Sequence, residues 1–256
     1  MSYETITIDK EDGVGLLTLN RPDKRNAMSP QLTLDVSQAL EELRYDDEVR
    51  VLVITGAGEA FCGGMDLKEH FTALKDTPDE YDRITRASTE WRGRTLRYYP
   101  KPTIAMINGY CFGGAFSIVE GCDLAFASEE ATFGLSEINF KIFPGGAVSK
   151  SLANLLRPRD ALFYGLTGRP FDGKVAADIG LVNFAFPKDE LRDRTFEIAR
   201  ELAGKDKHAL QMAKEAYRHS LDMGWEAAVD FAMAKEAELS MLQSNAWREE
   251  GIGDFL

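Results

Sequence analysis

The stretch Lys101-Pro-Thr-Ile-Ala-Met-Ile-Asn-Gly-Tyr-Cys-Phe-Gly-Gly-Ala-Phe-Ser117 predicts a short buried strand, a glycine turn and the start of a helix. Pro102 cannot donate to a sheet ladder and suits the first residue of a strand, and the apolar residues 103–107 suit its interior. Gly113 and Gly114 follow at the predicted helix N-terminus, where two backbone N–H groups are open to a ligand. Such donors can hold a developing oxyanion, although a strand–glycine–helix junction can also serve packing alone.

A second glycine-rich loop follows another strand of parallel-sheet character. Residues 51–55 form that strand, and the loop after it contains Gly63-Gly64-Met65 before a helix that begins near Asp66. Ligands of open α/β sheets bind beyond the carboxyl ends of the strands, so we expect the two loops to meet there. The N–H groups of Met65 and Gly114 would then converge on one oxygen and form an oxyanion hole for a thioester enolate.

A group that carries protons is needed near this hole, and Glu137 is the candidate. It lies in Gly134-Leu-Ser-Glu-Ile-Asn139, which we expect to be extended and to continue a strand at 131–134. Burial between apolar neighbours would raise the pKa of Glu137 towards the range of a general acid–base group. The alternative, a surface glutamate in a loop, stays open at this point.

The rest of the chain predicts a parallel α/β core followed by a helical region. Residues 3–9 and 14–20 form a hairpin, and Ser29 caps a helix that starts at Pro30. The alternation of strands and helices implies right-handed parallel crossovers. We place a further strand at 123–127 and helices at 81–98, 149–156, 158–166, 173–179, 189–203, 207–223 and 226–243.

Composition and charge disfavour several classes of protein. The 256 residues carry a formal net charge of −12, which disfavours a nucleic-acid partner. The three cysteines form no CxxC pair, which indicates reduced thiols and a cytoplasmic location. No metal-site spacing, signal segment or membrane-spanning run occurs, so we expect neither a metal nor a membrane partner.

Many spaced motifs together resemble the enoyl-CoA hydratase/isomerase (crotonase) superfamily across residues 3–245. They lie at 20–22, 24–27, 56–58, 61–67, 108–109, 113–114, 122–123, 133–137, 166–172 and 176–183. The resemblance implies an α/β fold with a crotonase-type β-β-α spiral core and a C-terminal helical trimerisation region. We therefore expect a core with the CoA-thioester site at 1–195, an oligomerisation or lid region at 196–256, and homotrimers or dimers of trimers.

The same resemblance assigns roles to individual residues, with CoA as part of the substrate and no separate cofactor. The family's oxyanion hole corresponds to Met65 and Gly114, and one of its two catalytic glutamates corresponds to Glu137. The other glutamate is replaced by Ser117, which either hydrogen-bonds near the hole or fills space. The residues that the resemblance places against substrate or CoA are Lys24, Ala27, Gly63, Leu67, Gly113 and Ser136, with Tyr110 and Phe140 as aromatic walls or core packing. Lys24 as a plain solvated charge also stays open.

Within the superfamily, the chain most resembles the hydroxycinnamoyl-CoA (feruloyl-CoA) hydratase-lyases. The shared stretches are Asn26-Ala-Met-Ser-Pro30, Gly64-Met-Asp-Leu-Lys-Glu69, Cys111-Phe-Gly-Gly114 and residues 132–139. These enzymes also carry serine at the position of Ser117. The implied reaction is hydration of an aryl-substituted enoyl-CoA, followed by retro-aldol cleavage to an aromatic aldehyde and acetyl-CoA.

Two residues depart from that subgroup, whose tyrosines hold the phenolic hydroxyl of the substrate. This chain has His70 and Met233 at those positions. His70 can still hydrogen-bond a phenol but Met233 cannot donate, and a change of this kind can alter the acyl group that is accepted. Hydration or isomerisation without cleavage therefore stays open. A non-catalytic binding protein of the same fold also stays open, although both glycine loops and Glu137 argue against it.

Overall fold

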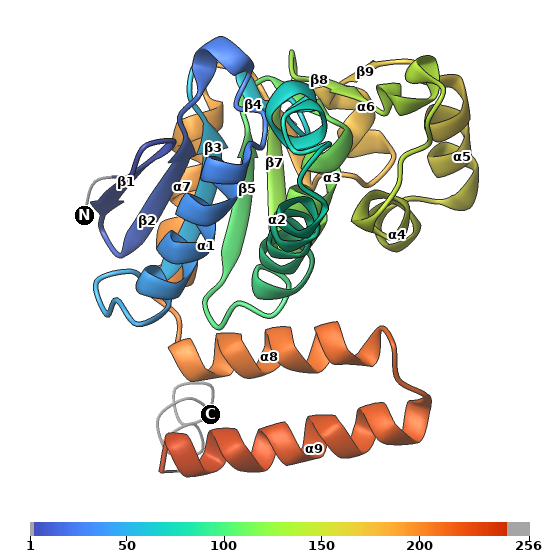
Figure 1. Cartoon of the computed structure of the whole chain (residues 1–256). Helices are drawn as coiled ribbons and strands as arrows, with labels where there is room; N and C mark the ends of the chain where they lie inside the picture. Colours follow the sequence, from blue (N-terminus) through green and yellow to red (C-terminus); the bar gives the residue numbers. More distant parts are fainter. Residues whose placement is uncertain (1–2, 245–256) are drawn as a thin grey trace.

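The computed structural model describes residues 3–244, which are built around a six-stranded sheet of order β1-β2-β3-β5-β7-β10 (Figure 1). The hairpin β1–β2 is antiparallel, and every other neighbouring pair is parallel. The predicted hairpin and parallel core are therefore confirmed. The strands are β1 (Ile6–Glu11), β2 (Val14–Leu19), β3 (Val51–Gly56), β5 (Thr103–Ile107), β7 (Leu124–Ser128) and β10 (Phe184–Phe186).

Helices cover both faces of this sheet, so its central strands are apolar throughout. On one face lie α1 (Pro30–Arg44), α2 (Pro78–Glu90) and α3 (Phe116–Gly121), and on the other lies α7 (Leu191–Ala203) (Figure 1). In β3, Leu52 and Ile54 belong to one buried cluster, while Val51 and Val53 belong to the other. Burial on both faces explains the continuous apolar run that identified this strand in the sequence.

A second sheet has the order β4-β6-β8-β9, and of its strands only β8 matches a predicted one, at 131–134. Its members are β4 (Ala60–Cys62), β6 (Tyr110–Phe112), β8 (Thr132–Gly134) and β9 (Phe171–Asp172). Strands of two or three residues are too short to show a period in the sequence. The three glycine- or glutamate-containing loops of the predicted site each follow one of the adjacent strands β4, β6 and β8. This small sheet is therefore what brings the three loops together.

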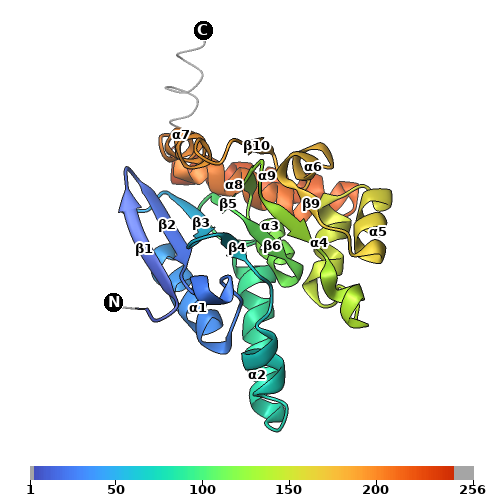
Figure 2. The ribbon, with the colours of Figure 1, turned by 90° about the horizontal axis from the view of Figure 1, so that it is seen from above.

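Two predicted elements differ from the structure. The expected extended segment around Glu137 is instead a 3-10 helix, η5 (Ser136–Phe140). Just beyond its end, Ile142 N–H donates to Glu137 O at 3.2 Å. A segment of five residues is too short for its pattern to distinguish a strand from a single helical turn. Here the chain turns back at Lys141, which has a φ of 63°, and the segment is helical. The expected helix at 81–98 begins earlier, at Pro78, and continues past α2 as a π-helix, η3 (Trp91–Thr95). Figure 2 shows α2 extending well beyond the neighbouring α1.

The remaining elements follow the predicted order. Ser29 Oγ accepts from Leu32 N–H at 3.1 Å and caps α1, as its sequence position indicates. The short helices are η1 (Pro22–Lys24), η2 (Leu67–Thr72), η4 (Gly113–Ala115), α4 (Ala147–Leu155), α5 (Pro158–Thr167) and α6 (Gly173–Asp178). Within residues 3–244, none of the helices combines the length and the apolar character that crossing a membrane requires.

Helices α8 (Lys207–Ser220) and α9 (Trp225–Leu242) form a hairpin that lies to one side of the sheets (Figure 1). Buried charges join α8 to the core: Lys214 Nζ lies 2.7 Å from Asp123 Oδ2, and Arg218 Nη2 donates to Cys122 O at 2.7 Å. Our division of the chain at residue 195 falls inside α7, whose Phe196 is buried against the sheet. The arm thus begins after α7, and residues 245–256 of the expected second region lie outside the described residues.

Candidate active site

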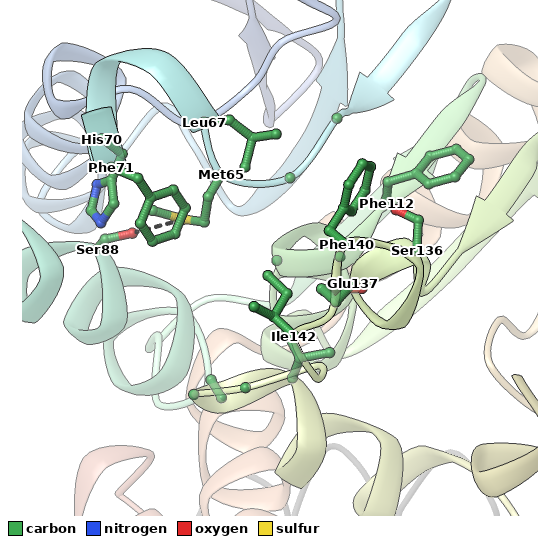
Figure 3. A pocket seen from close by; sticks show the side chains of 18 of the residues that line it. Met65, Leu67, His70, Phe71, Ser88, Phe112, Ser136, Glu137, Phe140 and Ile142 are labelled. Carbon is green, nitrogen blue, oxygen red and sulfur yellow. Dashed lines mark hydrogen bonds between the residues drawn. The ribbon is translucent and has the colours of Figure 1, made fainter. Parts of the chain in front are cut away.

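A pocket of about 570 Å³ lies where the loops after β4, β6 and β8 face α2 and η3 (Figure 3). His70 and Ser88 lie on one side of it, and Glu137, Phe140 and Ile142 lie across from them (Figure 3). Most of the lining is apolar or glycine backbone, with a few polar groups. That composition is typical of a small-molecule site.

The two glycine loops meet at the predicted oxyanion hole. Met28 N–H donates to Gly64 O at 2.8 Å, and Met28 O accepts from Asp66 N–H at 3.0 Å, as in a parallel bridge to Met65. Successive peptide groups of an extended chain point to opposite sides, so the N–H of Met65 points away from Met28. A Cβ built on Gly64 would lie 3.5 Å from the N atom of Gly114, so the two loops are in contact. The structure therefore brings Met65 and Gly114 together, and their role stays a prediction.

Glu137 lies directly against the second of these loops. Gly113 has a φ of +50°, and a Cβ built on it would lie 2.7 Å from Glu137 Oε1. The other carboxyl oxygen, Oε2, is buried and has no hydrogen-bond partner among the described residues. Burial raises the pKa of Glu137 above its ordinary value, and a hydrogen bond from its own backbone only partly opposes this rise. The predicted direction of the pKa shift is confirmed, and the carboxyl faces the pocket as a proton carrier would.

Ser117 lies behind the hole, in the first turn of α3, and does not line the pocket. Its buried Oγ donates to Gly114 O at 2.7 Å and accepts from Arg92 Nη1 at 2.9 Å. The hydrogen-bonding role that we expect for Ser117 therefore acts through Gly114 and Arg92. Contact with the substrate stays a prediction without a geometric basis in one chain.

Arg92 lines the pocket, and the sequence analysis did not identify it. Its Nε donates to Ser88 O at 2.8 Å and its Nη1 donates to Gly114 O at 3.2 Å. Burial lowers the pKa of Arg92 to about 10, so it still carries its positive charge near neutral pH. The π-helical turn η3 buries Arg92 together with its neighbour Trp91. Such turns are frequent at functional sites, and this one has no clear sequence signature.

His70 extends from η2, which Asp66 caps by accepting from Lys68 N–H and Glu69 N–H. The side chain is 1% exposed, and its Nε2 lies 3.2 Å from Thr85 Oγ1. Its Nδ1 has no partner among the described residues. Burial, aided by the charge of Arg92, lowers the pKa of His70, so the ring is neutral at pH 7. His70 thus lines the pocket, and its contact with the substrate stays a prediction.

The other predicted contacts divide into two groups. Those that line the pocket are Gly63, Leu67, Tyr110, Gly113, Ser136 and Phe140. Lys24 is exposed on η1 outside it. Its neighbour Arg25 lines the pocket instead, with its guanidinium carbon 4.8 Å from the ring centroid of Tyr110. The backbone of Ala27 is hydrogen-bonded within its own loop: its N–H donates to Lys24 O, and its carbonyl accepts from Arg21 Nη1.

Met233 does not line this pocket in the described part of one chain. It lies on α9, which α8 separates from the rest of the chain (Figure 1), and it is 63% exposed. The expected contact with the substrate is therefore not made within a single chain, and it stays a prediction. The reason is tertiary: the α8–α9 hairpin points away from the loops that follow β4, β6 and β8.

Asn26 is a supporting residue that the sequence analysis did not single out. Its side chain is buried, with Nδ2 donating to Ala57 O at 2.9 Å and to Ala60 O at 2.7 Å. Its Oδ1 accepts from Arg21 N–H at 2.8 Å. These bonds fasten the loop before α1 to the strand that leads into Gly63 and Gly64. The only sequence signal was its place within a motif of the resembled family.

Comparisons with known proteins agree on one family. A family model described as enoyl-CoA hydratase/isomerase matches residues 9–256. A hydroxycinnamoyl-CoA hydratase-lyase from Pseudomonas fluorescens is 45% identical over 255 residues, which cover 99% of this chain and 92% of that protein. A 2,3-dehydroadipyl-CoA hydratase from Escherichia coli is 34% identical, over 98% of this chain and 95% of that protein. The crystal structure of an enoyl-CoA hydratase from Mycobacterium smegmatis matches with a TM-score of 0.90 at 28% identity, over 98% of this chain and 96% of that one.

Proposed function

The chain belongs to the enoyl-CoA hydratase/isomerase family, and from this premise we propose that it hydrates and then cleaves an aryl-substituted enoyl-CoA. The substrate class is the hydroxycinnamoyl-CoA thioesters, such as feruloyl-CoA, and the products are an aromatic aldehyde and acetyl-CoA. One observation carries the proposal beyond the similarity of sequence. Glu137 is the one acidic residue among the described residues that line the pocket, and Ser117 stands where a second carboxylate would serve a two-carboxylate hydratase.

One carboxylate suffices if it changes its role between the steps. In hydration, Glu137 takes a proton from water, the water oxygen bonds to the β-carbon, and the electron pair of the double bond moves onto the thioester oxygen. Protonated Glu137 then gives its proton to the α-carbon. In cleavage, Glu137 takes the proton of the β-hydroxyl, the bond between the α- and β-carbons breaks, and the aldehyde leaves. The resulting enolate takes the proton back from Glu137 and becomes acetyl-CoA.

Both steps pass through the same thioester enolate, so a single oxyanion hole serves both. The N–H groups of Met65 and Gly114 are the donors to the thioester oxygen. Donors held in place before the reaction stabilise charge as it develops without reorganisation. Arg25, at the pocket edge on the ring of Tyr110, is the cation that we assign to the phosphates of CoA.

The pH dependence of the reaction should report the raised pKa of Glu137. As a base the carboxyl must be deprotonated, so kcat/KM should rise with pH along an acid limb that lies above the ordinary glutamate value of 4.5. A pH profile of kcat/KM measures this limb. A His70→Gln variant is the control, because the limb should persist in it. A profile that is flat from pH 4.5 upwards would contradict the assignment of Glu137 as the base.

The proposed reaction is tested by mixing the purified protein with feruloyl-CoA and identifying the products. Vanillin and acetyl-CoA in equal amounts are expected. If only the β-hydroxyacyl-CoA accumulates, cleavage is refuted and the protein is a hydratase. If aliphatic enoyl-CoA thioesters react rapidly and feruloyl-CoA does not react, the aryl substrate class is refuted. The replacement of tyrosine by His70 makes such a change of acyl group a real alternative.

We further propose that the chain forms trimers or dimers of trimers through the α8–α9 arm and acts in the cytoplasm. Supporting the first point, α9 exposes Trp225 and Met241 at 80% and 83%. Exposed apolar patches of this kind are typical of interfaces. Supporting the second, Cys62, Cys111 and Cys122 are free and buried, as is usual where thiols stay reduced. Light scattering of the native protein measures the number of copies.

A further inference from the structure

We propose that Arg92 supplies a fixed positive charge behind the oxyanion hole and so stabilises the thioester enolate. The inference rests on the proposed function for the enolate itself, but it concerns a residue to which neither the family motifs nor the two-donor hole assigns a role. Arg92 would act through its charge, beside the two backbone donors Met65 and Gly114.

The position of Arg92 is defined by its contacts with the second hole residue. Its Nη1 lies 3.2 Å from Gly114 O and 2.9 Å from Ser117 Oγ. A Cβ built on Gly114 would lie 3.1 Å from Nη1 and 3.5 Å from Met65 Cγ. The guanidinium is therefore in contact with the peptide backbone whose neighbouring N–H serves the hole. No rearrangement is needed to bring the charge there.

The charge of Arg92 has no counter-ion among the described residues. None of the ion pairs formed by residues 3–244 includes Arg92, although the side chain is only 7% exposed. A buried, unpaired cation costs several kcal/mol of desolvation, so it persists only where something compensates it. The hydrogen bonds of Nε and Nη1 compensate part of this cost. The two N–H groups of Nη2 have no partner among the described residues, and the side chain lines the pocket.

The titratable groups coupled to Arg92 leave its positive charge unbalanced. His70 and Cys62, which interact electrostatically with Arg92, supply no negative charge: burial lowers the pKa of His70, and burial raises the pKa of the Cys62 thiol to about 11. Gly113 and Gly114 begin η4, so their backbone N–H groups lie in the same region as the guanidinium. The guanidinium and the backbone donors thus favour negative charge in the same region of the pocket. The anion that forms there in the proposed reaction is the enolate oxygen.

The test separates charge from structure with two variants and a control. Arg92→Gln removes the charge, and Arg92→Lys keeps it. Arg94→Gln is the control, because Arg94 lies in the same π-helix and its side chain is 74% exposed. The readout is deuterium exchange at the α-carbon of 3-phenylpropanoyl-CoA in D2O, followed by NMR. Glu137 takes an α-proton, the electron pair moves to the thioester oxygen, and Glu137 returns a deuteron after exchange with solvent.

Arg92→Gln should lower the exchange rate roughly 10- to 100-fold while the Kd for the thioester changes little. Arg92→Lys should recover most of that loss, and Arg94→Gln should match the unchanged protein. The retained Kd shows that the variants are folded. Because exchange requires no cleavage, exchange without aldehyde formation from feruloyl-CoA would refute the proposed function and leave this inference standing.

Three results would overturn the inference. Unchanged exchange in Arg92→Gln, or absence of exchange in the unchanged protein, would show that the charge does not serve an enolate. Equal losses in Arg92→Lys and Arg92→Gln would show that the guanidinium only holds Gly114 and Ser117 in place. A loss confined to 3-(4-carboxyphenyl)propanoyl-CoA, with 3-phenylpropanoyl-CoA unaffected, would make Arg92 a binding group for an anionic acyl substituent instead.

Discussion

Glu137→Gln is expected to lower kcat for aldehyde formation by about 10³-fold and to leave thioester binding intact. The amide has nearly the shape of the carboxyl but cannot accept a proton from water or from the β-hydroxyl. Every step of the proposed reaction moves a proton through this one group, and no other carboxyl lines the described pocket. The measurement is steady-state kinetics with feruloyl-CoA, together with a Kd from calorimetry.

Glu130→Gln is the matched control, because Glu130 is exposed in the turn before β8 and only seven residues away in the sequence. It should retain wild-type kinetics. If Glu137→Gln kept turnover within a few-fold of wild type while Glu130→Gln did the same, the proton carrier would have to be sought elsewhere.

Stability provides an independent check on the same variant. The pKa of Glu137 is raised in the folded state, so the folded protein binds this proton more tightly than the unfolded chain does. Its contribution to the free energy of unfolding is present below the ordinary pKa and is lost as the pH rises through the raised value. Near pH 7, Glu137→Gln should therefore melt no lower than wild type. A lower Tm would show that the loss of activity reflects damage to the fold.

Gly64→Ala is expected to lower kcat by about 10²-fold, the scale of losing one donor from an oxyanion hole. Gly64 has a φ of +92°, and an added Cβ would lie 2.8 Å from Phe112 O, which is backbone and cannot move aside cheaply. The same Cβ would lie 3.5 Å from the N atom of Gly114. Relief of these contacts must push the Met65 loop away from Gly114, so the two N–H groups no longer converge on one oxygen.

Gly180→Ala separates this effect from backbone strain alone. Gly180 has a φ of +82°, but an added Cβ there would meet only Leu155 O, at 3.8 Å, which is an ordinary van der Waals contact. Both variants should lose stability because alanine resists a positive φ. Only Gly64→Ala should lose kcat once the folded fraction is corrected for. Equal kcat values in the two variants would refute the role of the Met65 loop as half of the hole.

Several parts of the site were predictable because their signals are local. The apolar runs of β3 and β5 are long enough to identify buried parallel strands, and each is followed by a loop with paired glycines. The apolar neighbours of Glu137 suggested burial but left a surface position open; in the structure Ile138 is exposed, and the carboxyl lies against Gly113 instead. By contrast, the resemblance transferred Met233 to the site although α9 lies apart from it in one chain, and it preferred Lys24 where Arg25 lines the pocket.

By itself, the sequence of this protein determined the parallel core, the two glycine loops and the position of Glu137, the carboxyl to which we assign the proton transfers. These depend on hydrophobic patterns and backbone freedom within about 20 residues of chain. Only the tertiary structure decided how they meet. The small sheet pairs Cys62 with Cys111 and Cys111 with Phe133, across separations that no local pattern encodes. The π-helical turn that buries Arg92 behind Gly114 likewise depends on packing against α3, so the charge beside the hole could be found only in the folded chain.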